Sequence, residues 1–498
     1  MSSIDASIEL DITAVKKRSV KGMFSLVGRT IIIQIVGFIS NLGLTILLSP
    51  KDYGVFILVS AITGFLSYLS DIGLAAALIQ KKDSLTKNDL RTTFTIQQLL
   101  VGSIVITGLV LSHWGAKFFN LNNDAVWLLR VLIISLFFSS LKTIPSILLE
   151  RKLSFEKFVI PQLAENIVFS VTVLFLAWKG FGVSSFTYSV MLRSLTGIIF
   201  IYIVSPWRPS VGIDKQSAKE LIKFGVPFQL NSILALVKDD FMTIIMGKIL
   251  NITQVGYLGW AQKWAYLPLR VIMDNVIRVT FPAFSRMQSD KNALRSAIEE
   301  AMFISALLTF PILTGLLMAS QSLIEIIPNY QKWQPAYTLL IIYILGSYIS
   351  SVTVIITNAI NAVGKIKITL KLMTFWTALT WFLSIPLALK YGSLGTALAW
   401  LLVTISTTLT FIIVYKIFRV NSLSVLYSPT ISSIVMIIFI KFSFSFIEPS
   451  NIFSLTLIIF SGFSIYLITS VLTAKKRLIK NLAMFKSSLK RKKQIFQF

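Results

Sequence analysis

The chain has 498 residues, of which 55% are hydrophobic and only 14% are charged, whereas an average soluble domain carries about 25% charged residues. Its mean hydropathy of +0.78, and apolar runs of about 20 residues, the length of a membrane-spanning helix, exclude a soluble protein. There is no cysteine and a single histidine, and the net charge is +26, so disulfide frameworks and cysteine-based metal sites are excluded as well.

Residues 1–21 are polar and then basic, without the apolar stretch of a signal peptide. After them, the lengths of the apolar runs predict an all-α integral membrane protein with about fourteen transmembrane helices, because β-barrel strands would show only about ten alternating residues. The expected spans, in chain order, are 22–48, 54–79, 93–112, 125–149, 159–178, 183–204, 221–248, 255–283, 297–319, 337–360, 368–389, 394–415, 428–446 and 452–473.

An internal repeat predicts how these helices are grouped. The outer turn at Leu48–Gly54 has the same spacing as the turn at Leu250–Gly256, which follows the seventh helix. Helices 1–6 and 7–12 are therefore expected to form two lobes of the same orientation around a central cavity, as in transporters with parallel repeats. The predicted divisions are a cytoplasmic segment 1–21, an N-lobe 22–204, a linker 205–220, a C-lobe 221–415, two added helices 428–473 and a tail 474–498.

Lysine and arginine predict the orientation in the membrane. The termini and the loops on one side hold 32 of these residues, and the loops on the other side hold 7. The excess marks the cytoplasmic side, so the chain is expected to be a multi-pass protein of the cell membrane with both termini in the cytoplasm. Because the charge is spread over many loops rather than gathered in one domain, we expect no nucleic-acid partner.

The tail after residue 474 has a pattern of its own. Leu478, Leu482, Phe485 and Leu489 recur at helical spacing, and lysines and arginines surround them. This pattern is typical of an amphipathic helix that binds anionic membrane lipids. A disordered basic tail is the alternative interpretation.

Eight basic residues fall outside the loop counts, and five acidic residues lie at a similar depth in the predicted spans. A charge at the middle of such a helix costs about 2.5–3.5 kcal/mol, so it must reach the interface, pair, or face water. Arg29 and Arg130, near helix ends, are expected to reach the interface, whereas Arg193 lies near the middle of its helix. The remaining members of the set are Lys142, Lys238, Lys263, Arg270, Arg278, Asp71, Glu165, Asp239, Asp240 and Asp274.

The eighth predicted helix carries the most informative group of charges. At 100° per residue, Lys263, Arg270, Asp274 and Arg278 fall within about 80° of one another. Asp274 lies four residues from each arginine, so partial ion pairing is available. The stripe is interpreted either as a salt-bridge ladder between helices or as a cationic wall for an anionic head group.

Other polar positions leave their roles open. Lys238, Asp239 and Asp240 are consecutive in the seventh helix and cannot all face one cavity, so one carboxylate is expected to pair with a neighbouring helix or to bind a coupling ion. Small polar stripes mark the first two helices, and the second of them ends at Asp71. Such stripes favour either close helix packing or a substrate path. Their members are Gln34, Gly37, Asn41 and Thr45, then Ser60, Gly64, Ser67 and Asp71.

The sequence contains no signature of an enzyme. A Walker A loop, a dinucleotide-binding glycine fingerprint and zinc-ligand spacing are all missing from it. With the spans given above, no outer loop exceeds about 18 residues. These loops leave little room for a catalytic domain. We therefore predict no catalytic residue, no cofactor and no metal site.

Three segments resemble the Wzx-type polysaccharide flippases, which belong with MATE exporters and the peptidoglycan-precursor flippase in one superfamily. The first is LSPKDYGVFILVSAITGFLSYLSDIGLAAALIQKKD, from Leu48. The second is KDDFMTIIMGKILNITQVGYLGWAQKWAYLPLR with the FPAFSRMQSDKNALRSA that follows it, and the third is NAVGKIKITLK, from Asn361. The resemblance covers most of the first twelve helices.

This resemblance implies two six-helix lobes around a cavity, and alternating access that moves a polyprenyl-diphosphate-linked oligosaccharide to the outer leaflet for O-antigen or exopolysaccharide synthesis. It also implies that basic residues line the cavity, and contact with polysaccharide polymerase machinery is a further expectation. The predicted substrate-binding residues are Arg193, Lys263, Arg270, Arg278 and Lys142; the predicted coupling or ion-pair residues are Asp240, which matches a family acid in the seventh helix, and Asp274, Asp71 and Glu165.

Three rival functions remain. A MATE-like exporter of cationic drugs would have to bind its cargo in a net positive cavity. A membrane enzyme that polymerises or transfers lipid-linked sugars would need a larger outer domain or a deep cluster of acids or histidines. A passive scramblase is compatible with the same sequence.

Overall fold

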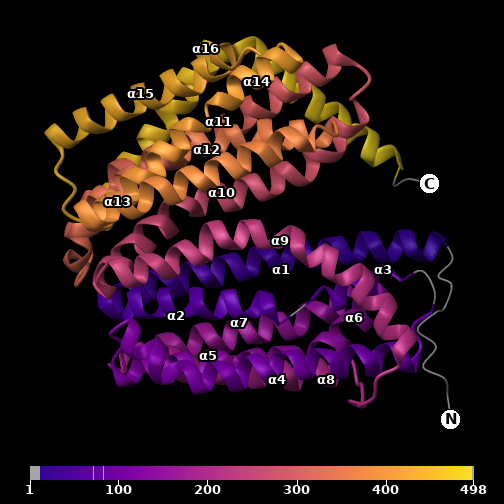
Figure 1. Ribbon diagram of the computed structural model, residues 1–498. Helices are drawn as coiled ribbons and strands as arrows, with labels where there is room; N and C mark the ends of the chain where they lie inside the picture. Colours follow the sequence, from indigo (N-terminus) through magenta and orange to yellow (C-terminus); the bar gives the residue numbers. More distant parts are fainter. Residues whose placement is uncertain (1–11, 71, 82–83, 496–498) are drawn as a thin grey trace. The chain divides into compact units, whose positions relative to one another are not determined.

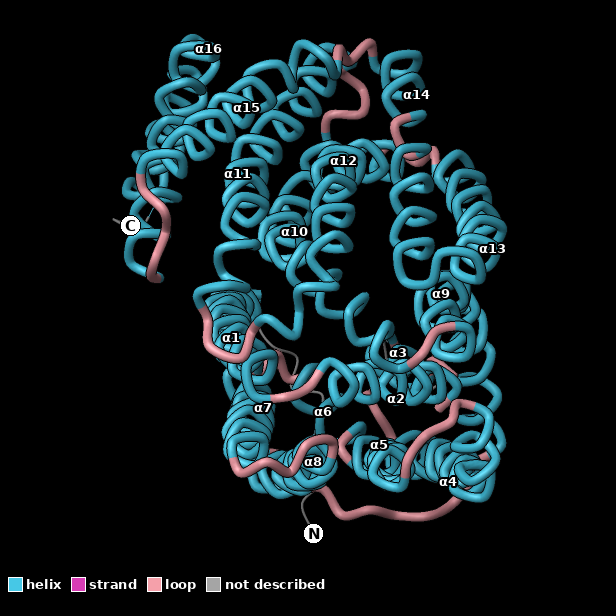
Figure 2. Tube along the Cα trace, turned by 90° about the vertical axis from the view of Figure 1, so that its left-hand side faces the viewer, coloured by secondary structure: helices cyan, strands magenta, loops and turns pink. Residues whose placement is uncertain are grey.

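The computed structural model describes residues 12–70, 72–81 and 84–495, with side chains described outside 12–27, 227–228, 230–239, 476 and 480–495. Every regular element in this described part of the chain is a helix, and short loops connect them (Figure 2). The all-helical fold class is therefore confirmed. The first nine helices are α1 Ile12–Leu47, α2 Pro50–Leu69, α3 Leu74–Gln80, α4 Lys87–Phe118, α5 Asn123–Leu141, α6 Thr143–Arg151, α7 Phe155–Trp178, α8 Ser184–Val204 and α9 Lys215–Ile249.

The second half of the chain continues in the same way. Its elements are α10 Ile252–Arg286, α11 Lys291–Ile326, the short 3₁₀ helix η1 Gln331–Ala336, α12 Tyr337–Ala362, α13 Ile366–Ser406, α14 Leu409–Phe418, α15 Ser422–Phe446 and α16 Ile452–Ile495. Within the described residues, 11 helical segments are long and apolar enough to cross a membrane. The protein is thus a multi-pass membrane protein, and the number of about fourteen crossings stays a prediction.

One of the 11 segments, Ile366–Phe418, has 53 residues and would extend about 80 Å as a straight helix, far beyond a hydrocarbon core of about 30 Å. Its backbone leaves helical geometry at Gly392, where φ is 61° and ψ is −138°. A Cβ atom on Gly395 would overlap the Leu387 carbonyl oxygen and lie 3.1 Å from the Ala388 nitrogen. The chain therefore folds back at Gly392, in agreement with the two spans predicted on either side of it.

The chain divides into two compact units, Met1–Gly256 and Tyr257–Phe498. In Figure 1 the first is coloured indigo to magenta and the second rose to yellow. Helix α9 packs against α2, α3 and α4 and falls within the first unit; the division into an N-lobe and a C-lobe stays a prediction.

In the first unit, α7 packs between α1 and α8, and α5 packs against α2, α4 and α8. Apolar residues of these helices form a buried core that includes Leu44, Val59 and Ile133. The rings of Phe56 and Phe186 stack within it, with centroids 4.0 Å apart. This packing fixes α5, α7 and α8, which carry Arg130, Glu165 and Arg193.

The second predicted span is interrupted rather than continuous. Helix α2 ends at Leu69 and α3 begins at Leu74, and Gly73 between them has a φ of 79°. A Cβ atom on Gly73 would overlap the Gly225 carbonyl oxygen of α9 and lie 2.8 Å from the Gly225 Cα. Two backbones thus touch at this break. Asp71 lies outside the described residues.

The first turns of α2 and α10 also touch through backbone atoms. A Cβ on Gly54 of α2 would overlap the Ile252 oxygen of α10 and lie 2.8 Å from the Gly256 nitrogen. A Cβ on Gly256 would in turn overlap the Pro50 oxygen and lie 3.1 Å from the Gly54 nitrogen. The contact is reciprocal, and it joins the two turns whose equal spacing the sequence shows.

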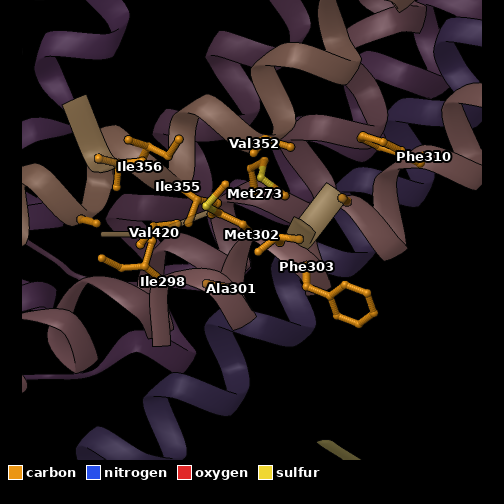
Figure 3. Packing of buried hydrophobic residues seen from close by; sticks show 14 of the residues in the cluster. Met273, Ile298, Ala301, Met302, Phe303, Phe310, Val352, Ile355, Ile356 and Val420 are labelled. Carbon is orange, nitrogen blue, oxygen red and sulfur yellow. The ribbon is translucent and has the colours of Figure 1, made fainter. Parts of the chain in front are cut away.

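In the second unit, α10, α11 and α12 share a buried core of Met273, Ile298, Met302, Val352 and Ile355 (Figure 3). Helices α15 and α16 pack against each other and against α11. The backbone of α16 bends at Ala474 (φ −128°, ψ 26°) and continues as a helix to Ile495. Just after the bend, Arg477 Nε lies 3.0 Å from a carboxylate oxygen of Glu300 on α11.

Candidate functional site: charged clusters within the helical bundle

The first unit brings three of the predicted site residues together. Glu165 on α7 is buried, and its carboxylate accepts a hydrogen bond from the Lys142 ammonium at 2.6 Å. Its other oxygen lies 3.8 Å from Arg193 Nε on α8. The cluster carries two cations and one carboxylate, so it retains one positive charge. Arg193 is the loosely held member, since 45% of its side chain is exposed, compared with 19% for Lys142.

Pro145 explains why Lys142 is placed at this point. Proline has no N–H to donate to the carbonyl four residues earlier, which here belongs to Leu141. The Tyr202 hydroxyl of α8 donates to that carbonyl instead, at 3.1 Å. Lys142 therefore lies at the junction of α5 and α6, where the sequence analysis expected one continuous helix from 125 to 149.

Gly197 provides the room for the Lys142–Glu165 pair. A Cβ atom at this position, one turn beyond Arg193 on α8, would overlap the Glu165 Oε1 atom and lie 2.9 Å from Lys142 Nζ. A buried pair repays the loss of hydration only when its geometry is close. Gly197 is thus a position of the site that was not predicted from the sequence. Its place four residues after Arg193, and so on the same face of α8, is the feature that could have pointed to it.

Arg29 extends the polar region to α1. Its guanidinium donates to the Gln162 side chain on α7, three residues before Glu165; that Arg29 reaches the membrane interface stays a prediction. Its Nε atom is buried and has no hydrogen-bond partner within the described residues. Arg130 donates from Nε to the Ser112 hydroxyl at 3.1 Å. Both arginines are held by neutral polar side chains of neighbouring helices.

Asp240 lies on the face of α9 that packs against α2. A Cβ on Gly64 would be 3.7 Å from the Asp240 Oδ2 atom, and the rings of Phe65 and Phe241 have centroids 5.7 Å apart. Gly64, one member of the polar stripe of α2, therefore lies next to Asp240. The side chains of Lys238 and Asp239 lie outside those the structure describes.

The charged stripe of α10 belongs to the second unit. Lys263, Arg270, Asp274 and Arg278 are all exposed, while Ala261 and Ala265 are buried on the other side of the helix. In the described part of the chain, Arg270, Asp274 and Arg278 form no ion pair within 4 Å. Among the described side chains, a salt-bridge ladder between helices is therefore not seen for these three residues.

Aromatic contacts hold the N-terminal half of α10 in place. The Trp260 ring stacks on Trp333 of η1 at 5.4 Å, with 11° between the ring planes. Its indole N–H donates to the Tyr330 hydroxyl at 3.2 Å, and Gln262 donates to the Tyr343 hydroxyl at 2.9 Å. These contacts fix the rotation of α10 about its axis and hence the direction of its charged stripe.

The predicted residues thus form two groups in different units: Glu165 with Lys142 and Arg193, and the stripe of α10. Asp240 stands apart from both, facing α2. Within the described residues, no three histidine, aspartate or glutamate side chains come together as a metal site would require.

Two proteins of similar sequence match this chain along most of its length. The succinoglycan biosynthesis transport protein ExoT of Rhizobium meliloti is 22% identical over 455 residues, covering 88% of this chain and 90% of ExoT. The lipopolysaccharide biosynthesis protein WzxC of Escherichia coli is 23% identical over 386 residues, covering 76% of this chain and 77% of WzxC.

The fold also has solved counterparts. The lipid II flippase MurJ, in an inward closed conformation, matches with a TM-score of 0.74 at 18% identity, covering 92% of this chain and 100% of that chain. An inward-facing multidrug resistance MATE family transporter of the MOP superfamily matches with a TM-score of 0.59 at 13% identity, covering 79% of this chain and 95% of that chain. These likenesses establish the fold.

The sequence profile of a family described as polysaccharide biosynthesis protein matches residues 44–338, which is more than half of the chain. The resemblance to Wzx-type flippases, drawn from segments within and just beyond this range, is confirmed at the level of the family. The chain belongs to the polysaccharide biosynthesis protein family.

Proposed function

We propose that this protein moves a polyprenyl-diphosphate-linked oligosaccharide from the inner to the outer leaflet of the cell membrane, for the synthesis of a surface polysaccharide. The observation that carries the proposal is the α10 stripe, where Arg270 and Arg278 are exposed and form no ion pair within the described residues. The printed names of the relatives ExoT and WzxC, and of MurJ among the solved structures, support the same class of substrate.

The physical problem is the charge of the diphosphate. An anion that leaves water for the membrane interior loses hydration worth far more than any single hydrogen bond restores. A cation about 4 Å away returns about 4 kcal/mol at an effective dielectric constant of 20, and a guanidinium matches two phosphate oxygens at once. Arg270 and Arg278 supply this compensation, and the aromatic contacts of α10 hold the two arginines in position.

Alternating access completes the mechanism. In transporters built from two repeats, one lobe rocks against the other around a binding site near the middle of the membrane. The sugars need a polar cavity, while the polyprenyl chain stays in the bilayer, where transfer costs it nothing. Arg193, loosely held by Glu165, is a second candidate contact for the head group, and Asp240 is a candidate for the coupling ion.

The orientation and the partners follow from charge. The excess of lysine and arginine on one side favours cytoplasmic termini, and the basic helical segment after Ala474 suits an anionic leaflet. Contact with the polysaccharide polymerase machinery is part of the same proposal, because the flipped lipid-linked sugar must be handed to the enzyme that joins the units.

The test replaces single cations in cells that depend on this protein for surface polysaccharide. Arg270→Ala and Arg193→Ala are each expected to abolish export at wild-type membrane abundance, and to accumulate lipid-linked oligosaccharide in the inner leaflet. Lys371→Ala, which removes an exposed cation at the inner end of α13, is the matched control and should export normally. Normal export by both arginine variants would refute a cationic substrate site.

The rival functions give different results. A MATE-like exporter would confer drug resistance when overproduced, although a cationic drug would be repelled by the surplus of positive charge on α10. A membrane transferase would form glycosidic bonds as a purified protein. Either result would replace the proposal made here.

A further inference from the structure

Glu165 is shared unequally between its two cations. Its Oε1 atom accepts a hydrogen bond from the Lys142 ammonium at 2.6 Å, whereas Oε2 lies 3.8 Å from Arg193 Nε, too far for a hydrogen bond. Lys142 and Glu165 are also the more covered members, with 19% and 12% of their side chains exposed. The carboxylate is therefore held by Lys142, and its contact with Arg193 is open.

Arg193 lies beside this pair without being committed to it. Its guanidinium carbon is 5.7 Å from the centre of the ring of Phe169, which follows Glu165 by one turn of α7, and 45% of its side chain is exposed. Arg193 donates no hydrogen bond to any residue that the structure describes. Its N–H groups, which match the oxygens of a phosphate, are thus left for a ligand.

The charge of Lys142 maintains this arrangement. A shift of about 1 Å would bring Arg193 Nε to hydrogen-bond distance from Glu165, since a charged N–H···O bond is about 2.8 Å long. A buried carboxylate without a partner is strongly unfavourable, so Glu165 would turn to Arg193 if Lys142 carried no charge. A diphosphate would then have to displace a carboxylate before it could bind the guanidinium.

We propose that Lys142 is a positioning residue: its ammonium holds the Glu165 carboxylate, so that Arg193 stays available for the diphosphate head group of the substrate. This inference rests on the proposed function. Lys142, which the sequence predicts as a substrate-binding residue, then acts through Glu165 and does not itself touch the substrate. The surplus positive charge of the cluster stays on Arg193, its most exposed member.

The pairing is tested without substrate, by thermal unfolding of the purified full-length protein. In the wild type, Arg193→Met removes only an open contact and should shift the melting temperature little. In a Lys142→Met background, the same substitution takes the last partner from Glu165, so the melting temperature should fall clearly further. An equal shift in both backgrounds would overturn the inference. Loss of the folded protein with Lys142→Met alone would do the same, because Arg193 would then have failed to replace Lys142.

The consequence for transport is tested by the binding of a polyprenyl diphosphate to the purified protein and by export of surface polysaccharide in cells. Lys142→Met is expected to weaken binding about 10- to 100-fold, the effect of losing hydrogen bonds to a charged group, and to lower export. Adding Glu165→Gln removes the competing carboxylate and should restore both quantities. A double variant as weak as Lys142→Met would show that Lys142 contacts the substrate directly, and the inference would be wrong.

The inference and the proposed function fail in different ways. If removal of Arg193 leaves binding and export unchanged while Arg270→Ala abolishes export, Arg193 does not bind the head group, and the flippase stands without this role for Lys142. If neither change alters export, the proposed function itself fails.

Discussion

At the scale of single residues, the charges within the membrane are handled in two different ways. The Glu165 carboxylate pairs with the Lys142 ammonium, with Oε1 and Nζ 2.6 Å apart. The backbone of Gly197 lies so close to this pair that a Cβ atom there would overlap Glu165. The arginines of α10 are left exposed, at a cost that the membrane scale puts at about 2.5–3.5 kcal/mol for each central charge. The first arrangement stabilises the bundle, whereas the second keeps charge available for a ligand.

The tight contact at Gly197 gives a residue-scale prediction. Gly197→Ala forces a methyl group against the Glu165–Lys142 pair, and overpacking of this kind costs about 1–3 kcal/mol. Thermal unfolding of the detergent-purified protein is expected to shift to lower temperature. Gly102→Ala is the matched control, because a Cβ there meets no atom within 4 Å and alanine favours a helix. Equal melting temperatures for the two variants would contradict the crowding at Gly197.

Sequence reasoning could select the charged residues but not their partners. Hydropathy marks Lys142, Glu165 and Arg193 because each interrupts an apolar run. Which of them meet depends on the rotation of α7 and α8 about their axes, and this is set by packing that no single helix reveals. Neutral partners such as Gln162 carry no signal at all in an analysis based on charge.

At the scale of the elements, the predicted spans agree well with the observed helices, and the differences have local causes. The predicted turn near Gly392 is present because glycine takes the positive φ that the reversal needs. The breaks at Gly73 and Lys142 were missed because long apolar stretches lie on both sides of each short polar segment. At Lys142 the missing N–H of Pro145 provided a signal that the periodicity concealed.

The break before α3 can be tested by two glycines of similar conformation. Gly73 and Gly180 have φ values of 79° and 85°, so alanine meets comparable backbone strain at both, about 1–2 kcal/mol. Only Gly73 is crowded, by the backbone of Gly225, whereas a Cβ on Gly180 meets nothing within 4 Å. Gly73→Ala should therefore lower the melting temperature clearly more than Gly180→Ala does. A shift of the same size in both would mean that α3 does not touch α9 so closely.

At the scale of the whole molecule, the predicted topology offers a direct test, since the chain has no cysteine of its own. A single cysteine at Lys390 is expected to react with a membrane-impermeant maleimide in intact cells, because this loop is predicted to face outward. Lys365→Cys should react only after the cells are permeabilised. Labelling in the opposite order would invert the predicted orientation and place both termini outside.

The reciprocal contact of Gly54 and Gly256 has a consequence for how such chains can change length. Each contact pairs the fifth residue of one helix with the first carbonyl of the other, so one extra residue within the first turn of either helix would rotate the glycine by about 100° and remove both contacts together. Insertions are therefore expected to be excluded from the first turns of α2 and α10, although the loops before them can absorb an added residue. Variation in length should be found in the connecting loops.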